Sequence, residues 1–354
     1  MGRVSGIKTA AHIVTLFLLF RLVRCNIVLM NYLLNHTRFI LVFLFISWSL
    51  NAQVALPTFH GVQATPKGLY SFSSHTFTNC GATGKTGPTL SNCKSSYDVS
   101  WEDDTDLFNM TTQGIQEWTV PITGSYTITV RGASGGEHSA GTAKKFGTGA
   151  IMIGTFSLNQ EEVLSILVGQ QGNANSGGEW CGCGGGGGSF VVKKSGNTSL
   201  IVSAGGAGGD GSGSYPDRPK PGGSSATGDA TQAGTATQSG SKSSGAGGGF
   251  TYDGQDGEGG GGESFLNGGV GGTCIYGADV AHGGFGGGGA GTWWSVGGAA
   301  GGYQGGSTIA GYANDNGITA AKSYNNGSGQ NNSSGTTTTS SNSKLHGQVI
   351  ITLN

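Results

Sequence analysis

The sequence predicts an all-β protein, a β-sandwich into which glycine-rich segments are inserted and packed as polyproline-II helices. Three observations support this prediction. Residues that favour helix interiors are scarce at helical spacing, whereas short apolar or alternating runs bounded by turn residues recur. Glycine accounts for 72 of the 354 residues and is concentrated after Arg131. A last alternating run ends one residue before the C-terminus.

The predicted strands share either an apolar–polar alternation or a short apolar run. In chain order they are residues 69–77, two short strands within 118–130 around the turn Gly124-Ser125, and residues 150–156, 163–168, 190–192, 200–203 and 346–353. The strand 163–168 is apolar on both faces, which is typical of a buried strand. We expect strands 190–192 and 200–203 to form a hairpin, because residues 195–197 are turn formers.

The strand at residues 346–353 lies beyond the glycine-rich region. Its apolar residues alternate, so one of its faces is suited to a core. We therefore expect this strand to return to the sandwich and close a sheet. The glycine-rich segments at 177–320 are then insertions within one domain at 68–354.

The glycine runs must be either disordered or closely packed, because glycine costs about 0.5–1 kcal/mol more to order than alanine. Segments 205–213, 268–273 and 283–291 show a period of three, the repeat of a polyproline-II helix, which has no internal hydrogen bonds. Such helices are stable only when neighbouring segments accept nearly every amide hydrogen. We expect a packed bundle with edges shielded by Phe285, Trp293, Trp294 and Tyr303.

Two polar segments lack this period. Residues 210–244 are rich in Ser, Thr, Pro and Ala, and residues 323–344 are rich in Ser, Thr and Asn. Segments of this composition bury little apolar surface. Both are therefore expected to be flexible, solvated loops.

The N-terminal region, residues 1–52, is predicted to be a targeting signal. Its apolar core at residues 39–50 precedes Asn51-Ala52, a suitable cleavage site. A start at Met30 gives the length of a secretory signal peptide, followed by a short leader at 53–67. The alternative is a signal anchor, but a membrane span needs about 20 apolar residues and this core is shorter. We expect a secreted or cell-surface protein.

Because disulfides form in exported proteins, most of the cysteines are expected to pair. Cys80 and Cys93 flank a turn-rich stretch and are expected to form one bridge. Either Cys181 or Cys183 is expected to pair with Cys274, which leaves one cysteine over. A zinc site at Cys181-Gly-Cys183 is disfavoured, because no histidine or cysteine stands at zinc-site spacing.

The same compartment adds N-linked glycans to asparagine in N-x-S/T sequons. Such sequons in the mature region have the acceptor residues Asn109, Asn197, Asn326, Asn331 and Asn332. Their number suits a secreted glycoprotein.

The charge composition excludes one class of partner. The net charge is −1, only 10% of residues are charged, and no basic stripe exists, so nucleic acid is not an expected partner. Matches to glycine-rich phosphate loops arise here from composition and carry no weight. No cofactor is expected.

Three motifs resemble sites of chemistry, and for each we favour a structural interpretation. Residues 132–136 match G-x-S-x-G, but no helical pattern follows, as a nucleophile elbow requires, so Ser134 is not expected to be catalytic. Residues 205–213 fit a calcium-binding nonapeptide through Asp210, but the motif occurs once instead of in tandem. Four acidic residues suit a basic partner or a calcium ion, although solvated loop charges are the favoured interpretation: Asp253, Asp256, Glu258 and Glu263.

Short sequence segments that contain or adjoin the glycine runs follow one another in a fixed order. They are LSILVGQQG (164–172), GGGGGSFVV (184–192), LIVSAGGAGG (200–209), GGFGGGGAG (283–291), GGYQGG (301–306) and HGQVIITL (346–353). This order resembles the extracellular glycine-rich region of the anaplastic-lymphoma-kinase and leukocyte-tyrosine-kinase receptors. The resemblance extends over residues 68–354.

The resemblance implies a tumour-necrosis-factor-like, jelly-roll β-sandwich joined to a bundle of polyproline-II glycine helices. In those receptors the region binds small protein cytokines and brings two receptors together. The kinase signatures Val-Ala-Ile-Lys, His-Arg-Asp and Asp-Phe-Gly are absent from this sequence, so we expect no enzyme. We expect an extracellular recognition module with a secreted or cell-surface protein ligand. The alternative is a secreted glycine-rich structural or adhesive protein that self-associates.

Overall fold

The computed structural model describes residues 24, 26, 30, 31, 67–137, 145–174, 182–209, 220–236, 243–275, 281–292, 297–308, 317–339 and 345–354. The chain divides into two compact units, Met1–Thr65 and Pro66–Asn354. Four residues of the first unit are described, all helical, so the predicted signal, its start and the leader otherwise lie outside the described residues. Within the described part of the chain, no helix combines the length and hydropathy that a membrane span requires.

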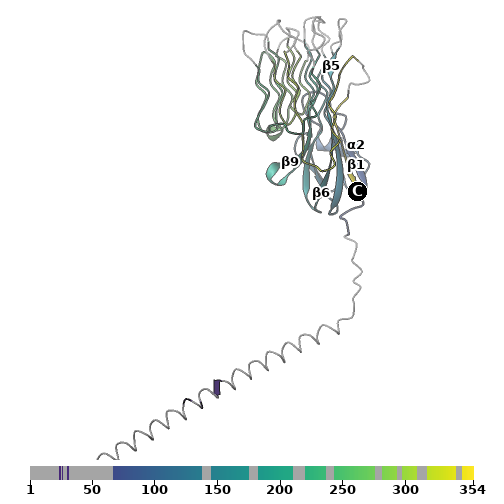
Figure 1. The fold of residues 1–354 in the computed structure, drawn as a ribbon. Helices are drawn as coiled ribbons and strands as arrows, with labels where there is room; N and C mark the ends of the chain where they lie inside the picture. Colours follow the sequence, from purple (N-terminus) through teal and green to yellow (C-terminus); the bar gives the residue numbers. More distant parts are fainter. Residues whose placement is uncertain are drawn as a thin grey trace, which may run out of the picture. The chain divides into compact units, whose positions relative to one another are not determined.

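The second unit contains an antiparallel four-stranded sheet. Its strands lie in the order β1 (Ser74–Phe77), β12 (Gln348–Leu353), β4 (Gly124–Arg131) and β6 (Ile151–Leu158). The outer strands β1 and β6 are labelled in Figure 1. The C-terminal strand thus returns to the sandwich as predicted, and it pairs with β1 on one side and β4 on the other. This position joins the two ends of the domain in one sheet.

A second, six-stranded antiparallel sheet faces the first. Its order is β10 (Tyr324–Asn325), β9 (Thr198–Ser203), β8 (Ser189–Lys193), β7 (Val163–Leu167), β3 (Ile115–Thr119) and β2 (Phe108–Thr112). The predicted β8–β9 hairpin is confirmed and turns through the 3-10 helix η1 (Ser195–Asn197). A separate pair joins β5 (Phe146–Gly147) and β11 (Thr337–Thr338). The all-β sandwich predicted from the sequence is therefore present.

The turn predicted at Gly124-Ser125 is wrong. Gly124 is the first residue of β4, and the chain leaves β3 at Thr119. The two strands belong to different sheets and do not pair, so residues 120–123 form a crossing between layers instead of a hairpin turn. Pro121 suits such a crossing, because proline cannot donate a hydrogen bond to a sheet.

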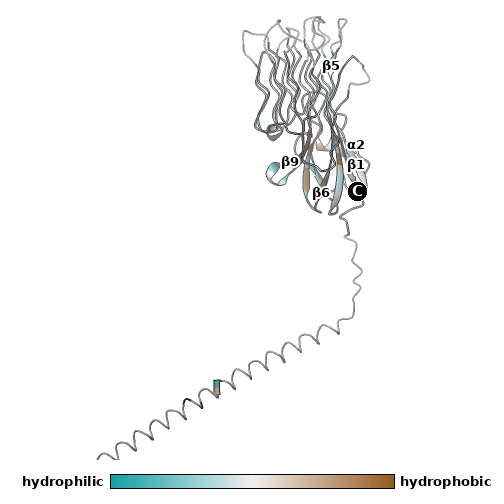
Figure 2. Cartoon of the chain, viewed as in Figure 1, coloured by the Kyte–Doolittle hydropathy of each residue, from teal (hydrophilic) through white to brown (hydrophobic). Residues whose placement is uncertain are grey.

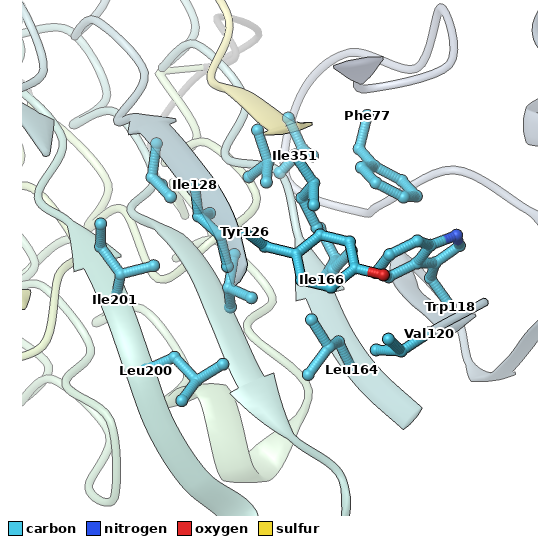
Figure 3. Packing of buried hydrophobic residues seen from close by; sticks show 14 of the residues in the cluster. Phe77, Trp118, Val120, Tyr126, Ile128, Leu164, Ile166, Leu200, Ile201 and Ile351 are labelled. Carbon is cyan, nitrogen blue, oxygen red and sulfur yellow. The ribbon is translucent and has the colours of Figure 1, made fainter. Parts of the chain in front are cut away.

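The main core lies between the two sheets (Figure 3). Alternate residues of β4, namely Tyr126, Ile128 and Val130, are fully buried there, as the alternation predicts. Trp118 of β3 and Ile166 of β7 approach them from the opposite sheet. Burial of large aromatic and branched side chains on both inner faces accounts for the stability of the sandwich.

A second core covers the outer face of the six-stranded sheet. Phe190 and Phe265 stack with ring centroids 5.2 Å apart, and Phe265 stacks on Phe250 at 5.4 Å. Tyr303 continues the series, 5.5 Å from Phe250 and 4.4 Å from Tyr324. Since Phe190 and Tyr324 come from strands and the other three from glycine-rich segments, this stack joins the sheet to the glycine region. Tyr303 and Phe285 were predicted to shield the edges of the bundle. Both instead pack at this junction between the sheet and the glycine region, where Phe285 is buried. Trp293 and Trp294 lie outside the described residues.

The glycine segments run side by side above the sandwich strands in Figure 1, and they are mostly pale in Figure 2, where brown is confined mainly to some of the sandwich strands. Their amides donate to neighbouring segments with a period of three. Gly184 and Gly187 donate to Asn173 and Gln170, whereas the amides one residue later, at 185 and 188, donate to Gly289 and Gly286. The amides at 183 and 186 donate to a third segment, at 209 and 206. This threefold surround is the packing expected of a bundle of polyproline-II helices.

One helix was not predicted. α2 (Leu90–Ser96) contains Cys93, which forms the predicted disulfide with Cys80. Its start has a capping box, in which Thr89 accepts from the amide of Asn92 and the Asn92 side chain accepts from the amide of Thr89. The Thr-x-x-Asn spacing is a weaker signal than the usual Ser/Thr-x-x-Glu, and the surrounding turn residues outweighed it.

The described part of the predicted flexible loop at 323–344, residues 323–339, is more regular than its composition suggests. It contains β10 and β11, and Ser328 and Ser333 form further bridges with β6. Backbone groups of Ser328 and Ser333 and the side chains of Asn325 and Asn332 bond to β6. Most side chains at 326–339 are exposed, as a solvated segment predicts, whereas its pairing with strands was not predicted. In the other polar segment, residues 220–236 also include bridges, at Gly223, Thr227 and Ala236.

Candidate recognition surface

The Ser134 motif does not build a nucleophile. Ser134 is 1% exposed, and its Oγ donates to the carbonyl oxygen of Leu345 (3.1 Å) and accepts from the Leu345 amide (2.9 Å). Residues 132–137 have no helical conformation, so the strand–turn–helix of a nucleophile elbow is not formed there. Ser134 instead fixes the chain that leads into β12.

Two of the predicted acidic residues organise turns. Asp253 Oδ1 accepts from the Ser264 amide (2.7 Å) and from Asn267 Nδ2 (2.9 Å), and Asp256 Oδ1 accepts from the Gly261 amide (2.7 Å). Burial alone would raise the pKa of Asp253, but these hydrogen bonds outweigh it and hold that pKa below its ordinary value. Among the residues that the structure describes, His, Cys, Asp and Glu form no group of three able to hold a metal ion. Asp210 lies outside those residues.

The predicted bridge between Cys183 and Cys274 is not formed. Cys183 is buried in the bundle, where its Cβ would lie 3.0 Å from a Cβ added at Gly136, so it faces the segment after β4. The amide of Cys274 donates to Nδ1 of His282 (2.9 Å) at the margin of the bundle. The alternative pairing, Cys181 with Cys274, involves a residue outside the described part of the chain.

The predicted glycan acceptors differ in exposure. Asn197, Asn326 and Asn331 are exposed, whereas Asn109 and Asn332 are half-buried. Asn109 Oδ1 accepts from the Met110 amide (2.8 Å). All five lie on or beside the strands of the sandwich.

An apolar surface is exposed where the glycine bundle turns back beside the six-stranded sheet. Tyr252 is 55% exposed and Leu266 is 42% exposed. Leu266 belongs to the 3-10 helix η2 (Phe265–Asn267), and its amide donates to Phe250 (3.2 Å), so the two turns are bonded to each other. We call Tyr252 and Leu266, with the adjoining Asp253, the turn surface.

The sequence around the turn surface contains local signals for a short helical turn. Ser264 caps η2 and accepts from the Asn267 amide, and Gly268 ends it with φ +109°. Ser before Phe-Leu-Asn-Gly has the N-cap and glycine stop of a short helical turn. Apolar residues within a polar, glycine-rich segment also mark positions where side chains either anchor the bundle or face solvent.

A second surface feature is an open depression of about 600 Å³ near the turn between β8 and β9. Glu162 and Lys193 line it and form an ion pair with 2.9 Å between Oε1 and Nζ. Burial would raise the pKa of Glu162, but hydrogen bonds from Asn159 and Lys193 outweigh it and lower that pKa. Lys194 reaches from the same depression to Glu117 Oε2 at 2.7 Å. Three of the four charged side chains that line the depression are thus in ion pairs, and Glu161 is the fourth.

Comparison with known proteins gives a partial similarity. No protein-family model matches the chain. A stretch of 96 residues, 27% of the chain, is 38% identical to the leukocyte tyrosine kinase receptor of Mus musculus. The stretch covers 11% of that receptor, so the match concerns a small part of the larger protein. The resemblance to the leukocyte-tyrosine-kinase receptor that the glycine-rich segments suggested is thus supported over about a quarter of this chain.

Proposed function

We propose that the chain is an extracellular recognition module for a secreted or cell-surface protein, similar to the ligand-binding region of the leukocyte-tyrosine-kinase and anaplastic-lymphoma-kinase receptors. The observation that carries the proposal is the local identity with the mouse receptor. We propose a binding role and no enzymatic one, since Ser134, the one candidate nucleophile raised by the sequence, is buried and bonded to Leu345.

The architecture supports binding through a rigid surface. Segments inside the bundle are bonded to several neighbours, and backbone hydrogen bonds tie the turn at Tyr252 to itself and to η2, from Gly249 to Tyr252 and from Leu266 to Phe250. A pre-organised surface loses less conformational entropy on binding than a flexible loop does. Tyrosine is enriched in protein interfaces, and Tyr252 is largely exposed on such a turn. We therefore place the recognition contact on the turn surface.

The test compares two variants in binding to a displayed set of extracellular proteins. Tyr252→Ala/Leu266→Ala removes the apolar part of the turn surface, whereas Leu69→Ala removes a side chain that is equally exposed, at 42%, on the sandwich. We expect wild type and Leu69→Ala to bind a common protein, and the double variant to bind it at least about tenfold more weakly, as for loss of an interface anchor. Thermal unfolding checks that the variants are folded.

Absence of any extracellular binder, or equal binding by the double variant, would contradict this proposal. Sedimentation of the protein alone over a wide concentration range tests the alternative, a glycine-rich structural protein that self-associates. Growth of the sedimentation coefficient with concentration in the absence of a partner would favour that alternative.

A further inference from the structure

The outer edge of β6 is covered by residues 325–335, which we call the edge cover. The amide of Ile151 donates to Ser333 (2.9 Å), and the amide of Ser333 donates back (2.8 Å). Thr155 and Ser328 exchange the same pair of bonds at 2.9 and 3.0 Å. Bare strand edges bind other strands, so this cover removes a site for edge-to-edge association.

Asn332 completes the cover with its side chain. Between the two backbone pairs, the amide of Ile153 donates to Asn332 Oδ1 (3.3 Å), which takes the place of a backbone carbonyl oxygen. The same Oδ1 accepts from Asn325 Nδ2 (2.8 Å), and Asn332 Nδ2 donates to Gln330 Oε1 (2.9 Å). Both ends of the Asn332 amide are therefore used inside the protein.

Asn331, the preceding residue, has the opposite orientation. Its backbone amide donates to Ile153 (3.1 Å), but its side chain is exposed and takes part in none of the described hydrogen bonds. Neighbouring residues of an extended segment project to opposite sides. The segment thus directs Asn332 toward β6 and Asn331 toward solvent.

The two residues lie in overlapping sequons, Asn331-Asn332-Ser333 and Asn332-Ser333-Ser334. We propose that the folded protein carries an N-linked glycan on Asn331 and none on Asn332, a proposal that rests on the export contained in the proposed function. The donor is an oligosaccharide on a lipid diphosphate. The bond from sugar C1 to the diphosphate oxygen breaks, a bond from C1 to Nδ2 forms, the amide loses one proton, and the lipid diphosphate leaves.

Only Asn331 can carry this group without changing the fold. An oligosaccharide on Asn332 would have to leave the space between the edge cover and β6, which would rotate the amide away from Ile153 and Asn325. The amide of Ile153 and the side chain of Asn325 would then lose this acceptor, and buried polar groups that lose their partners destabilise the folded state. On Asn331 the glycan extends from the covered edge into solvent and further separates that edge from a second molecule.

Two single substitutions distinguish the sequons. Ser333→Ala destroys the Asn331 sequon and leaves the Asn332 sequon intact, whereas Ser334→Ala does the reverse. Both serines are exposed, and Ser334 Oγ bonds only to surface Ser224 in the described structure. The full chain is expressed behind an unrelated secretory signal, so that glycosylation is tested independently of its own signal and of any binding partner.

Glycans are released enzymatically in heavy-oxygen water, and the labelled residue is identified by mass spectrometry. We expect the label at position 331 in wild type and Ser334→Ala, and its loss from both positions in Ser333→Ala. Label at 332 in any of the three, or label at neither position in wild type, would overturn the proposal. Failure to bind a protein partner would contradict the proposed function, but it would not change the expected positions of the glycan.

Discussion

The carbonyl oxygen of Phe285 lies where a side chain would begin at position 187, since a Cβ added to Gly187 would be 1.7 Å from it. The obstructing atom belongs to backbone that is itself bonded, because Phe285 accepts from the amide of Gln170. The segment cannot move away without breaking the threefold packing. We predict that Gly187→Ala lowers the free energy of unfolding by about 3 kcal/mol or more, measured by urea denaturation.

Gly223→Ala is the matched control. A Cβ at Gly223 meets only the carbonyl oxygen of Ala321, at 3.1 Å, and the backbone there does not need positive φ. We expect a change within about 1 kcal/mol, since alanine also orders at lower entropic cost. Equal effects of the two substitutions would show that the bundle is not closely packed in solution.

The sequence predicted the strands and the bundle for different physical reasons. Alternation in β4 and β12 reports burial on one face, and the period of three in residues 205–213 reports a glycine-lined helix. Neither pattern contains information on partners distant in sequence. The aromatic stack from Phe190 to Tyr324 could therefore not be predicted from the sequence, because its members are distant in the chain.

Local composition did not predict which polar residues bond to the sheet. Asn325 and Asn332 look like loop residues, yet both bond to the backbone of Ile153. The turn surface was missed for a related reason, because glycine density concealed the short helix η2. In both places a local polar or glycine-rich composition is used in long-range packing.

The disulfide provides a second prediction. It closes a loop across 13 positions, from Cys80 to Cys93, and restricts the unfolded chain. We predict that the double variant Cys80→Ser/Cys93→Ser loses about 3 kcal/mol of unfolding free energy in urea denaturation. A reducing agent should lower wild type to the same level and leave the variant unchanged. A variant as stable as oxidised wild type would show that α2 and its packing hold this loop without the bridge.

A third prediction concerns Gln170, which is fully buried at the junction of β7 and the bundle. Neither Oε1 nor Nε2 of its side chain has a hydrogen-bond partner in the described structure. Replacing a buried, unpaired polar group by an apolar one of similar shape is neutral or stabilising. Gln170→Met should therefore keep the unfolding free energy or raise it by about 1–2 kcal/mol. A loss above about 1 kcal/mol would indicate that the amide binds internal water.

The fourth prediction is a loss of stability in acid that depends on His75. The His75 ring is packed edge-on against Phe77 and Tyr97, with centroids 4.6 Å apart in each case, and burial lowers its pKa from 6.5 to about 4. Between pH 6.5 and 4 the unfolded chain therefore binds a proton that the folded chain does not. The unfolding free energy contributed by this group is complete above pH 6.5 and falls as the pH drops toward 4.

His75→Phe keeps a ring in this aromatic cluster and removes the titrating group. Glu162, Asp253, His282 and His346 also have lowered pKa values, so both proteins should lose stability in acid. The prediction is that wild type loses more than His75→Phe when urea denaturation is repeated from pH 7 to pH 4.5. Parallel pH profiles would mean that His75 is protonated in the folded protein and that its aromatic neighbours stabilise the charged ring.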